Sequence, residues 1–303
     1  MTPAITDRRG LWMAVGAFVI WGLMPLYWYL LREVPSLQIV LHRAVWCAVL
    51  VGAWLVLRGA RGWLRDVLLQ PRLAAMLAAS GALIALNWGL YVWAVNAGHV
   101  VEASLGYFIN PLLNVLIGVL FLRERLSPAQ WIAVALAACG VLWLTTRYGS
   151  FPWIALCLAC SFALYGVIRK FAAVEAVRGL GVENMFMLVP ALAWLGWIEL
   201  GGDGGFFSLR WGGWTDLLLV MGGALTAIPL IFFAYAVRRV PLSVVGLLQY
   251  IGPTLQLLLG VFFFGEDFGI ERAVGFGFIW VGLAAFAIDG ALAARRRVVA
   301  QQA

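Results

Sequence analysis

Polar side chains are rare in this chain, and the most regular group of them lies between residues 100 and 122. Tyr107, Asn110, Asn114 and Gly118 follow one another at steps of three and four, which places them on one face of a helix. Hydroxyl and amide groups on such a face form hydrogen bonds with a bound molecule or with a neighbouring helix. We therefore predict that this stripe lines a cavity, with interhelical hydrogen bonding as the alternative.

A second stripe with the same spacing lies 142 residues further along the chain. Its members are Gln249, Gly252, Gln256 and Gly260. Two stripes with one pattern favour a cavity shared by two related helices. Under the alternative, Gly118 and Gly260 are points where helices pack closely.

Further residues that could contact a solute lie in the first and third apolar runs. Asn87 and Tyr91 share roughly one face of the third run, and Trp21 lies in the first. Aromatic rings bind apolar or cationic solutes through stacking and cation–π contacts worth about 0.5–2 kcal/mol each, although many Trp residues instead form interfacial belts. The residues that we predict to bind a solute are Trp21, Asn87, Tyr91, Tyr107, Asn110, Asn114, Gln249 and Gln256.

Three ionisable residues lie inside apolar segments. His42 and Arg43 lie near the outer start of the second apolar run, and Glu102 lies near the outer end of the fourth. An Arg within a membrane span costs a few kcal/mol, so Arg43 is expected to pair or to reach the interface. One hypothesis is that Glu102 and His42 exchange protons during function. The alternative is a structural ion pair between Arg43 and Glu102.

Pro111 and Pro253 interrupt the middle of the two striped helices. A proline in a helix interior removes a backbone hydrogen bond and costs about 3 kcal/mol. Each kink could act as a hinge and expose the carbonyl group of residue 107 or 249. The alternative is a static kink, which is common in membrane helices.

A turn motif follows the first stripe and needs no chemistry to explain it. Ser127 and Gln130 have the spacing of a capping box, with Ser127 as the N-cap, Gln130 three residues later and Pro128 at the first helical position. Glu124 precedes this motif.

These residues stand out because the rest of the chain is apolar. Of its 303 residues, 64% are hydrophobic and 12% are charged, whereas about 25% are charged in a soluble domain. Folding buries only about three quarters of the surface of a chain of this length, so much apolar surface must face lipid. This composition excludes a cytosolic enzyme, a nucleic-acid binder and a disordered chain. All four cysteines lie in apolar runs, which favours packing over a zinc or redox site.

Ten apolar runs are long enough to span a bilayer, whose core of about 30 Å needs about 20 helical residues. They are residues 10–31, 36–57, 73–97, 100–122, 127–146, 150–170, 179–200, 214–237, 241–264 and 269–290. Backbone groups in lipid must bond within their own segment, so each run is expected to be a helix. The predicted fold class is an all-α integral membrane protein with ten transmembrane helices and no soluble domain.

The basic residues predict the orientation of these spans. With the N-terminus inside, sixteen Arg and Lys residues fall in inside segments and four fall outside, while Arg43 lies within a span. Inside segments of membrane proteins carry an excess of Arg and Lys. We therefore expect a bacterial-type cytoplasmic (inner) membrane protein with both termini in the cytoplasm. The net charge of +7 is then a topology signal.

The chain also repeats itself. A shift of 142 residues aligns ASLGYFINPLLNVLIGVLFLRE (103–124) with VGLLQYIGPTLQLLLGVFFFGE (245–266). This predicts a five-helix repeat over 1–146, a second over 150–290 and a basic cytoplasmic tail over 291–303. Because five is odd, the second repeat is inverted in the membrane. Inverted repeats are typical of secondary transporters, whose binding site lies near the midplane between the repeats.

The two repeats resemble the EamA domain of the drug/metabolite transporter superfamily, and within it the chain resembles the RarD subfamily. The segments that carry the resemblance are AFVIWGLMPLYW (17–28), LHRAVW (41–46), LNWGLYVWAVNAGHVVEASLGYFINPLLNVLIGVLFLRERLS (86–127) and PLSVVGLLQYIGPTLQLLLGVFFFGE (241–266). The family also has a basic residue at Arg43. The resemblance implies a transporter of small metabolites or drugs, and family analogy favours export.

The leading hypothesis is therefore a permease that exports a small organic solute by alternating access. No Walker A motif is present, so ATP is not its direct energy source. One alternative is a proton-coupled importer. Another is a membrane-embedded enzyme, but the only histidines are His42 and His99 and no suitable acidic pair accompanies them. We expect no enzymatic activity, no cofactor, no metal and no nucleic acid, with a small organic solute and membrane lipids as partners.

Overall fold

The computed structural model describes residues 7–60, 62–96, 99–148, 151–206, 210–265 and 269–302, and the secondary structure of these residues is entirely helical. In chain order the helices are α1 (Arg8–Leu30), α2 (Ser36–Leu57), α3 (Trp63–Leu68), α4 (Pro71–Asn96), α5 (Val100–Leu120), α6 (Pro128–Tyr148), α7 (Trp153–Phe171), α8 (Ala176–Leu200), α9 (Gly213–Val237), α10 (Leu242–Gln249), α11 (Ile251–Phe262) and α12 (Ile270–Gln302). The prediction of an all-helical chain is confirmed for these ranges.

Eight helical segments in the described part of the chain are long and apolar enough to cross a membrane. They are α1, α2, α6 to α9, most of α4, and α10 with α11 taken together. Shorter apolar stretches, Leu105–Leu120 in α5 and Ala273–Asp289 in α12, lie where the other two spans are expected. The total of ten spans stays a prediction.

The helices differ from the predicted runs in three places. The break expected at 58–72 contains the short helix α3, which buries Trp63 and Val67. The run expected at 241–264 is divided at Tyr250 into α10 and α11, because Pro253 has no N–H to donate to the carbonyl of Gln249. Helix α12 continues to Gln302 through the predicted tail.

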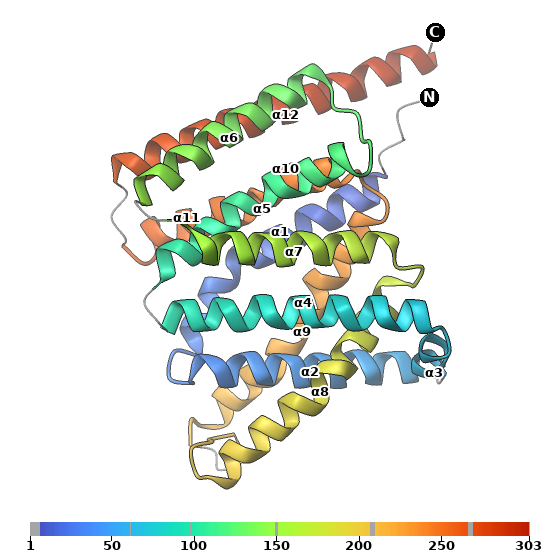
Figure 1. The fold of residues 1–303 in the computed structure, drawn as a ribbon, viewed down its shortest axis with the longest axis vertical. Coiled ribbons are helices and arrows are strands. Elements are labelled where there is room, and N and C mark those ends of the chain that lie inside the picture. Colours follow the sequence, from blue (N-terminus) through green and yellow to red (C-terminus); the bar gives the residue numbers. More distant parts are fainter. Residues whose placement is uncertain are drawn as a thin grey trace.

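Helices from the first half of the chain pack mainly against helices from the second half. Helix α6 contacts α12, α5 contacts α7 and α10, α2 contacts α8 and α9, and α1 contacts α9 and α11 (Figure 1). Figure 1 shows most helices running across the view, with the N- and C-termini and α3 on one side of the molecule. The two halves of the chain therefore share one helical bundle.

Small residues allow the closest of these contacts. A Cβ atom added to Gly140 of α6 would lie 2.6 Å from the carbonyl oxygen of Gly275 on α12, and one added to Gly282 would lie 2.8 Å from that of Ala133. Without a hydrophobic driving force between helices in lipid, such close backbone approach supplies van der Waals packing.

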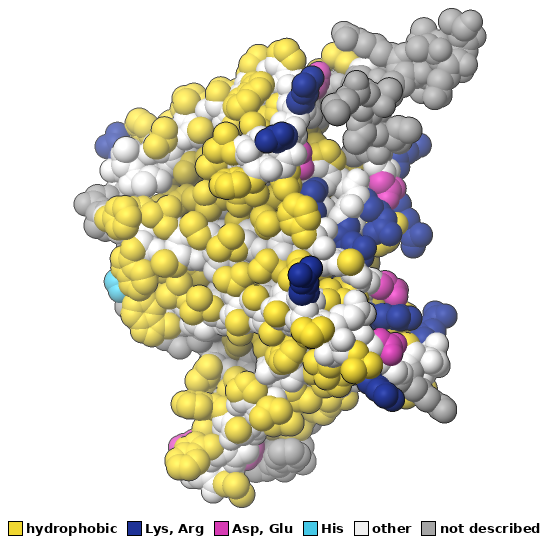
Figure 2. All heavy atoms as spheres, turned by 45° about the vertical axis from the view of Figure 1, so that its right-hand side comes forward, with side chains coloured by type: hydrophobic (Ala, Val, Ile, Leu, Met, Phe, Trp, Pro, Cys, Tyr) yellow, Lys and Arg dark blue, Asp and Glu magenta, His cyan; other side chains and the backbone are white. Residues whose placement is uncertain are grey.

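Basic and hydrophobic side chains occupy separate parts of the surface. Figure 2 shows Lys and Arg side chains gathered along the edge where Figure 1 places the termini and α3, while hydrophobic side chains cover much of the visible face. Large apolar residues such as Trp197 and Leu200 are 78% and 93% exposed. A broad apolar surface with one basic edge is the pattern of a protein embedded in lipid.

We predict that two glycine substitutions on the contacting helices differ in their effect on stability, and that only the first destabilises the protein. Gly140→Ala should destabilise the protein, because its methyl group meets backbone that cannot move without separating α6 from α12. Overpacking of this kind costs about 1–3 kcal/mol. Gly277→Ala on α12 is the matched control, because nothing lies within 4 Å of its new methyl group. Thermal unfolding of the purified protein in detergent measures both, and an equal response would contradict the packing argument.

Candidate functional site

A cavity of about 190 Å³ lies between helices from both halves of the chain. Residues of α1, α2, α4, α5, α7, α9, α10 and α11 line it. The lining includes Trp28 near the end of α1, Val40 near the start of α2 and Ala103 near the start of α5. The cavity therefore extends from the middle of the bundle toward the side opposite the basic edge.

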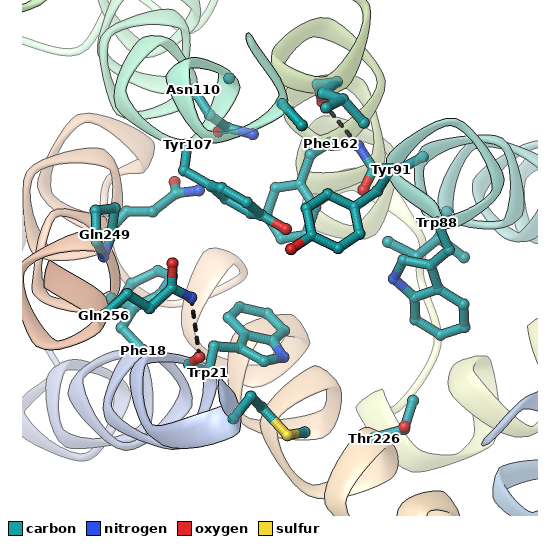
Figure 3. Close-up of a pocket in the computed structure, with 18 of the residues that line it drawn as sticks. Phe18, Trp21, Trp88, Tyr91, Tyr107, Asn110, Phe162, Thr226, Gln249 and Gln256 are labelled. Atoms are coloured by element: carbon teal, nitrogen blue, oxygen red, sulfur yellow. Dashed lines mark hydrogen bonds between the residues drawn. The ribbon is translucent and has the colours of Figure 1, made fainter. Parts of the chain in front are cut away.

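Most residues that we predicted to bind a solute lie in the wall of this cavity. They are Trp21, Asn87, Tyr91, Tyr107, Asn110, Gln249 and Gln256. In Figure 3 the hydroxyl groups of Tyr91 and Tyr107 point into the same space as the amides of Gln249 and Gln256. A role in binding stays a prediction, but the two stripes do meet at one cavity.

Asn114 is the exception, because it lies one turn from the cavity and is fully buried. Its Nδ2 donates to Oδ1 of Asn110 at 3.1 Å and to Oε1 of Gln249 at 2.7 Å. The alternative of interhelical hydrogen bonding thus describes Asn114, which joins α5 to α10. These two hydrogen bonds link Asn110 and Gln249, which line the cavity, to Asn114 behind them.

Two other lining amides are anchored to neighbouring helices. Asn87 donates from Nδ2 to the carbonyl of Leu158 at 2.8 Å and to Oγ of Ser161 at 2.9 Å. Gln256 donates from Nε2 to the carbonyl of Trp21 at 3.2 Å (Figure 3). Each side chain is therefore held in place through its donor, while its carbonyl oxygen takes no part in these bonds.

Arg43 lines the cavity and is held by aromatic rings. Its guanidinium carbon lies 4.7 Å from the ring centroid of Trp28 and 4.7 Å from that of Trp88. Its Nε donates to Oγ1 of Thr226 at 2.9 Å. The sequence offered no signal that Trp28 and Thr226 belong to the site, because each is an ordinary residue of an apolar helix until the fold brings α1, α2, α4 and α9 together.

The other residues predicted to couple or gate occupy different environments. His42 is buried outside the cavity lining, with its ring centroid 4.8 Å from that of Phe206. The side chain of Glu102 lies outside the described residues, so the predicted pair with Arg43 is untested. Pro111 lies within an uninterrupted α5, whereas Pro253 lines the cavity just beyond the division between α10 and α11.

A carboxylate joins the ends of three helices between the cavity and the basic edge. Glu124 accepts hydrogen bonds from the backbone N–H groups of Leu242 and Ser243 at 2.8 and 2.9 Å, and from Oγ of Ser243 at 2.8 Å. Nζ of Lys170 lies 3.5 Å from the same carboxylate. These contacts join the ends of α5 and α7 to the start of α10, where a negative charge is favourable.

The predicted capping box next to Glu124 is confirmed. The backbone N–H of Ser127 donates to Oε1 of Gln130 at 2.9 Å, and the N–H of Gln130 donates to Oγ of Ser127 at 3.2 Å. Oγ of Ser127 also donates to Oδ2 of Asp289 at 2.7 Å, a contact with α12 that the motif did not predict.

A buried ion pair was not predicted at all. Arg169 of α7 and Glu183 of α8 lie 3.4 Å apart, and both side chains are 1% exposed. Ser80 of α4 donates to Oε1 of Glu183 at 2.5 Å, and the Arg169 side chain donates to the carbonyl of Ala176 at 2.9 Å. A carboxylate such as Glu183 inside a predicted span is itself a signal of a paired group, but its position in one helix does not show which cation lies opposite it.

Comparison with known families gives a double match. The EamA-like transporter family matches residues 8–146 and again residues 151–288. The chain is 45% identical over 291 residues to an uncharacterized transporter of Pseudomonas aeruginosa, covering 95% of this chain and 96% of that protein. It is also 45% identical over 290 residues to the protein RarD of Streptomyces exfoliatus, covering 96% of this chain and 91% of the relative.

A solved crystal structure shares the fold. It superposes with a TM-score of 0.70 at 22% sequence identity, covering 92% of this chain and 97% of the other. The similarity therefore concerns the fold of nearly the whole chain.

We predict that the ion pair between Arg169 and Glu183 is needed for stability. Glu183→Gln leaves a buried guanidinium without its counter-charge and should destabilise the protein by about 3–5 kcal/mol. Glu175→Gln is the control, because its pair with Arg178 is exposed and worth about 0–1 kcal/mol. Thermal unfolding in detergent measures both variants. The double variant Arg169→Met/Glu183→Met should recover much of the loss; a double variant as unstable as Glu183→Gln would contradict this account.

Proposed function

Because this chain belongs to the EamA-like transporter family, we propose that it is a secondary transporter that exports a small organic solute by alternating access. In this proposal ten transmembrane helices form two inverted repeats, residues 1–146 and 150–290, followed by a basic cytoplasmic tail at 291–303. The double family match supports the two repeats. The observation that carries the function is a cavity with polar groups on helices from both halves of the chain. We propose no enzymatic activity and no cofactor.

The basic edge supports an orientation in the bacterial cytoplasmic membrane. Segments facing the cytoplasm carry an excess of Arg and Lys, so both termini and α3 would lie there. The cavity then lies between the midplane and the periplasmic face. The contacts of Glu124 lie on the cytoplasmic side, so this arrangement corresponds to a state closed toward the cytoplasm.

The geometry supports a route by which the solute and this closure affect one another. Gln249 contributes to the cavity wall and accepts the hydrogen bond of Asn114. It is the last residue of α10, the helix whose first residues are held by Glu124. A solute that accepts a hydrogen bond from Nε2 of Gln249 can reorient this amide, which alters its bond with Asn114 and the contact between α5 and α10. Helix α10 can then move relative to α11 at Tyr250, where the helix is already interrupted.

Counterflow of labelled solutes in proteoliposomes tests transport directly. Solute loaded inside should drive exchange of a labelled solute of the same kind, and Gln249→Ala should lower the exchange rate by about 3–10-fold, the effect of losing one hydrogen bond. Gly277→Ala is the control, because it adds a methyl group where nothing lies within 4 Å. No exchange across a broad panel of organic anions, cations and neutral solutes would contradict the proposal.

We predict that weakening the Glu124 contacts opens the cavity toward the cytoplasm. Gly252→Cys supplies a probe, because Gly252 lines the cavity and an added Cβ meets nothing closer than 3.6 Å. With the four native cysteines replaced by Ala, an impermeant maleimide should label this position faster from the periplasmic side. Adding Glu124→Gln should increase labelling in inside-out vesicles several-fold. Glu271→Gln, whose pair with Arg147 is exposed, should leave it unchanged.

A further inference from the structure

The cavity contains a cation that no described carboxylate neutralises. Arg43 lines the cavity, and the ion pairs among the described residues do not include it. The described wall carries hydroxyl, amide and aromatic groups but no Asp or Glu. By contrast, the fully buried Arg169 of α7 has its own counter-charge, Glu183, at 3.4 Å. An Arg at this depth costs a few kcal/mol, so a cation here that pairs with no carboxylate in the described part of the chain is a candidate for a functional role.

The contacts that hold Arg43 fix its orientation and leave its charge available. Trp28 and Trp88 flank the guanidinium, each at 4.7 Å, and Thr226 accepts from Nε at 2.9 Å. No hydrogen bond of the two Nη groups occurs among the described residues. Those groups carry four N–H donors in the planar fork that binds a carboxylate with two parallel hydrogen bonds.

The other residues that line the cavity indicate what the rest of the ligand is like. Trp21 and Phe162 have ring centroids 5.7 Å apart in an edge-to-face arrangement and form an aromatic wall. The hydroxyls of Tyr91 and Tyr107 point into the cavity from another side (Figure 3). The sequence suggested that Trp rings here could bind a cationic solute, but Trp28 and Trp88 already hold the cation of Arg43. A second cation would be repelled.

We propose that the cavity binds a small organic carboxylate with an aromatic or apolar body, its carboxylate paired with Arg43. This inference rests on the proposed function only in making the cavity the substrate site. The carboxylate supplies the missing counter-charge, and the body packs against Trp21 and Phe162. Neutral analogues of the same shape lose the paired hydrogen bonds, and cationic analogues are excluded.

Equilibrium dialysis of the purified protein tests this without requiring transport. The probes are radiolabelled benzoate, phenylacetate and 3-phenylpropionate, with phenylacetamide, phenethylamine and phenyl phosphate as unlabelled competitors. At least one carboxylate should bind, phenylacetamide should compete about 10–100-fold more weakly than phenylacetate, and phenethylamine should not compete. Binding of none of the three carboxylates, or equal competition by phenylacetamide, overturns the inference. Stronger competition by phenyl phosphate than by any carboxylate overturns the assignment to carboxylates.

Variants then identify the group that binds. Arg43→Gln should weaken carboxylate binding by about 10–100-fold, and Arg43→Lys should restore part of it through charge without the fork. Arg239→Gln is the control, because Arg239 lies at the surface beside Asp7. If Arg43→Gln does not fold, the comparison of phenylacetate with phenylacetamide on the unchanged protein decides whether the site recognises a carboxylate. Carboxylate binding that appears only in Glu102→Gln would show an internal ion pair with Arg43 and overturn the proposal.

The two proposals fail in different ways. Counterflow of neutral or cationic solutes without carboxylate binding would leave the transporter proposal standing and remove this inference. Carboxylate binding without exchange of any solute would support the anion site and contradict transport.

Discussion

Lipid offers no hydrogen bonds, and this constraint explains the pairing of the polar side chains that join the helices of this protein. Polar side chains inside the apolar helices must find partners within the bundle. Asn114 reaches both Asn110 and Gln249, and Glu183 reaches both Arg169 and Ser80. Because Gln249, Arg169 and Ser80 lie on other helices than the groups that they bond, these bonds also decide which helices are neighbours.

The two related stripes perform different tasks in the folded protein. Asn114 of α5 lies beneath the cavity, whereas the corresponding Gln256 lies in its wall and bonds to the backbone of α1. Pro111 lies in a continuous helix, but the helix containing Pro253 is divided at Tyr250. A sequence repeat thus produces similar helices that both line the cavity, and their neighbours decide which polar residue of each stripe faces it and where a helix is interrupted.

The cavity combines a fixed cation with aromatic walls, and that combination changes the expected ligand. Aromatic side chains alone are compatible with apolar, neutral or cationic solutes. Once Arg43 lies between Trp28 and Trp88, the ring faces that would attract a cation are in use. The same residues therefore favour an anion, because the guanidinium of Arg43 is held over these rings and repels a second cation.

The sequence by itself determined the helical class, the apolar runs, the capping box at Ser127 and most polar residues of the cavity wall, since all of these follow from composition and helical spacing. It did not reveal the contact of Thr226 with Arg43, the pairing of Arg169 with Glu183, or the contacts of Glu124 with α10. Those depend on contacts between helices far apart in the chain, and spacing within one helix carries no information about which face of another helix meets it. Only the tertiary structure, by packing α1, α2, α4 and α9 together, placed a charged group inside an aromatic cavity.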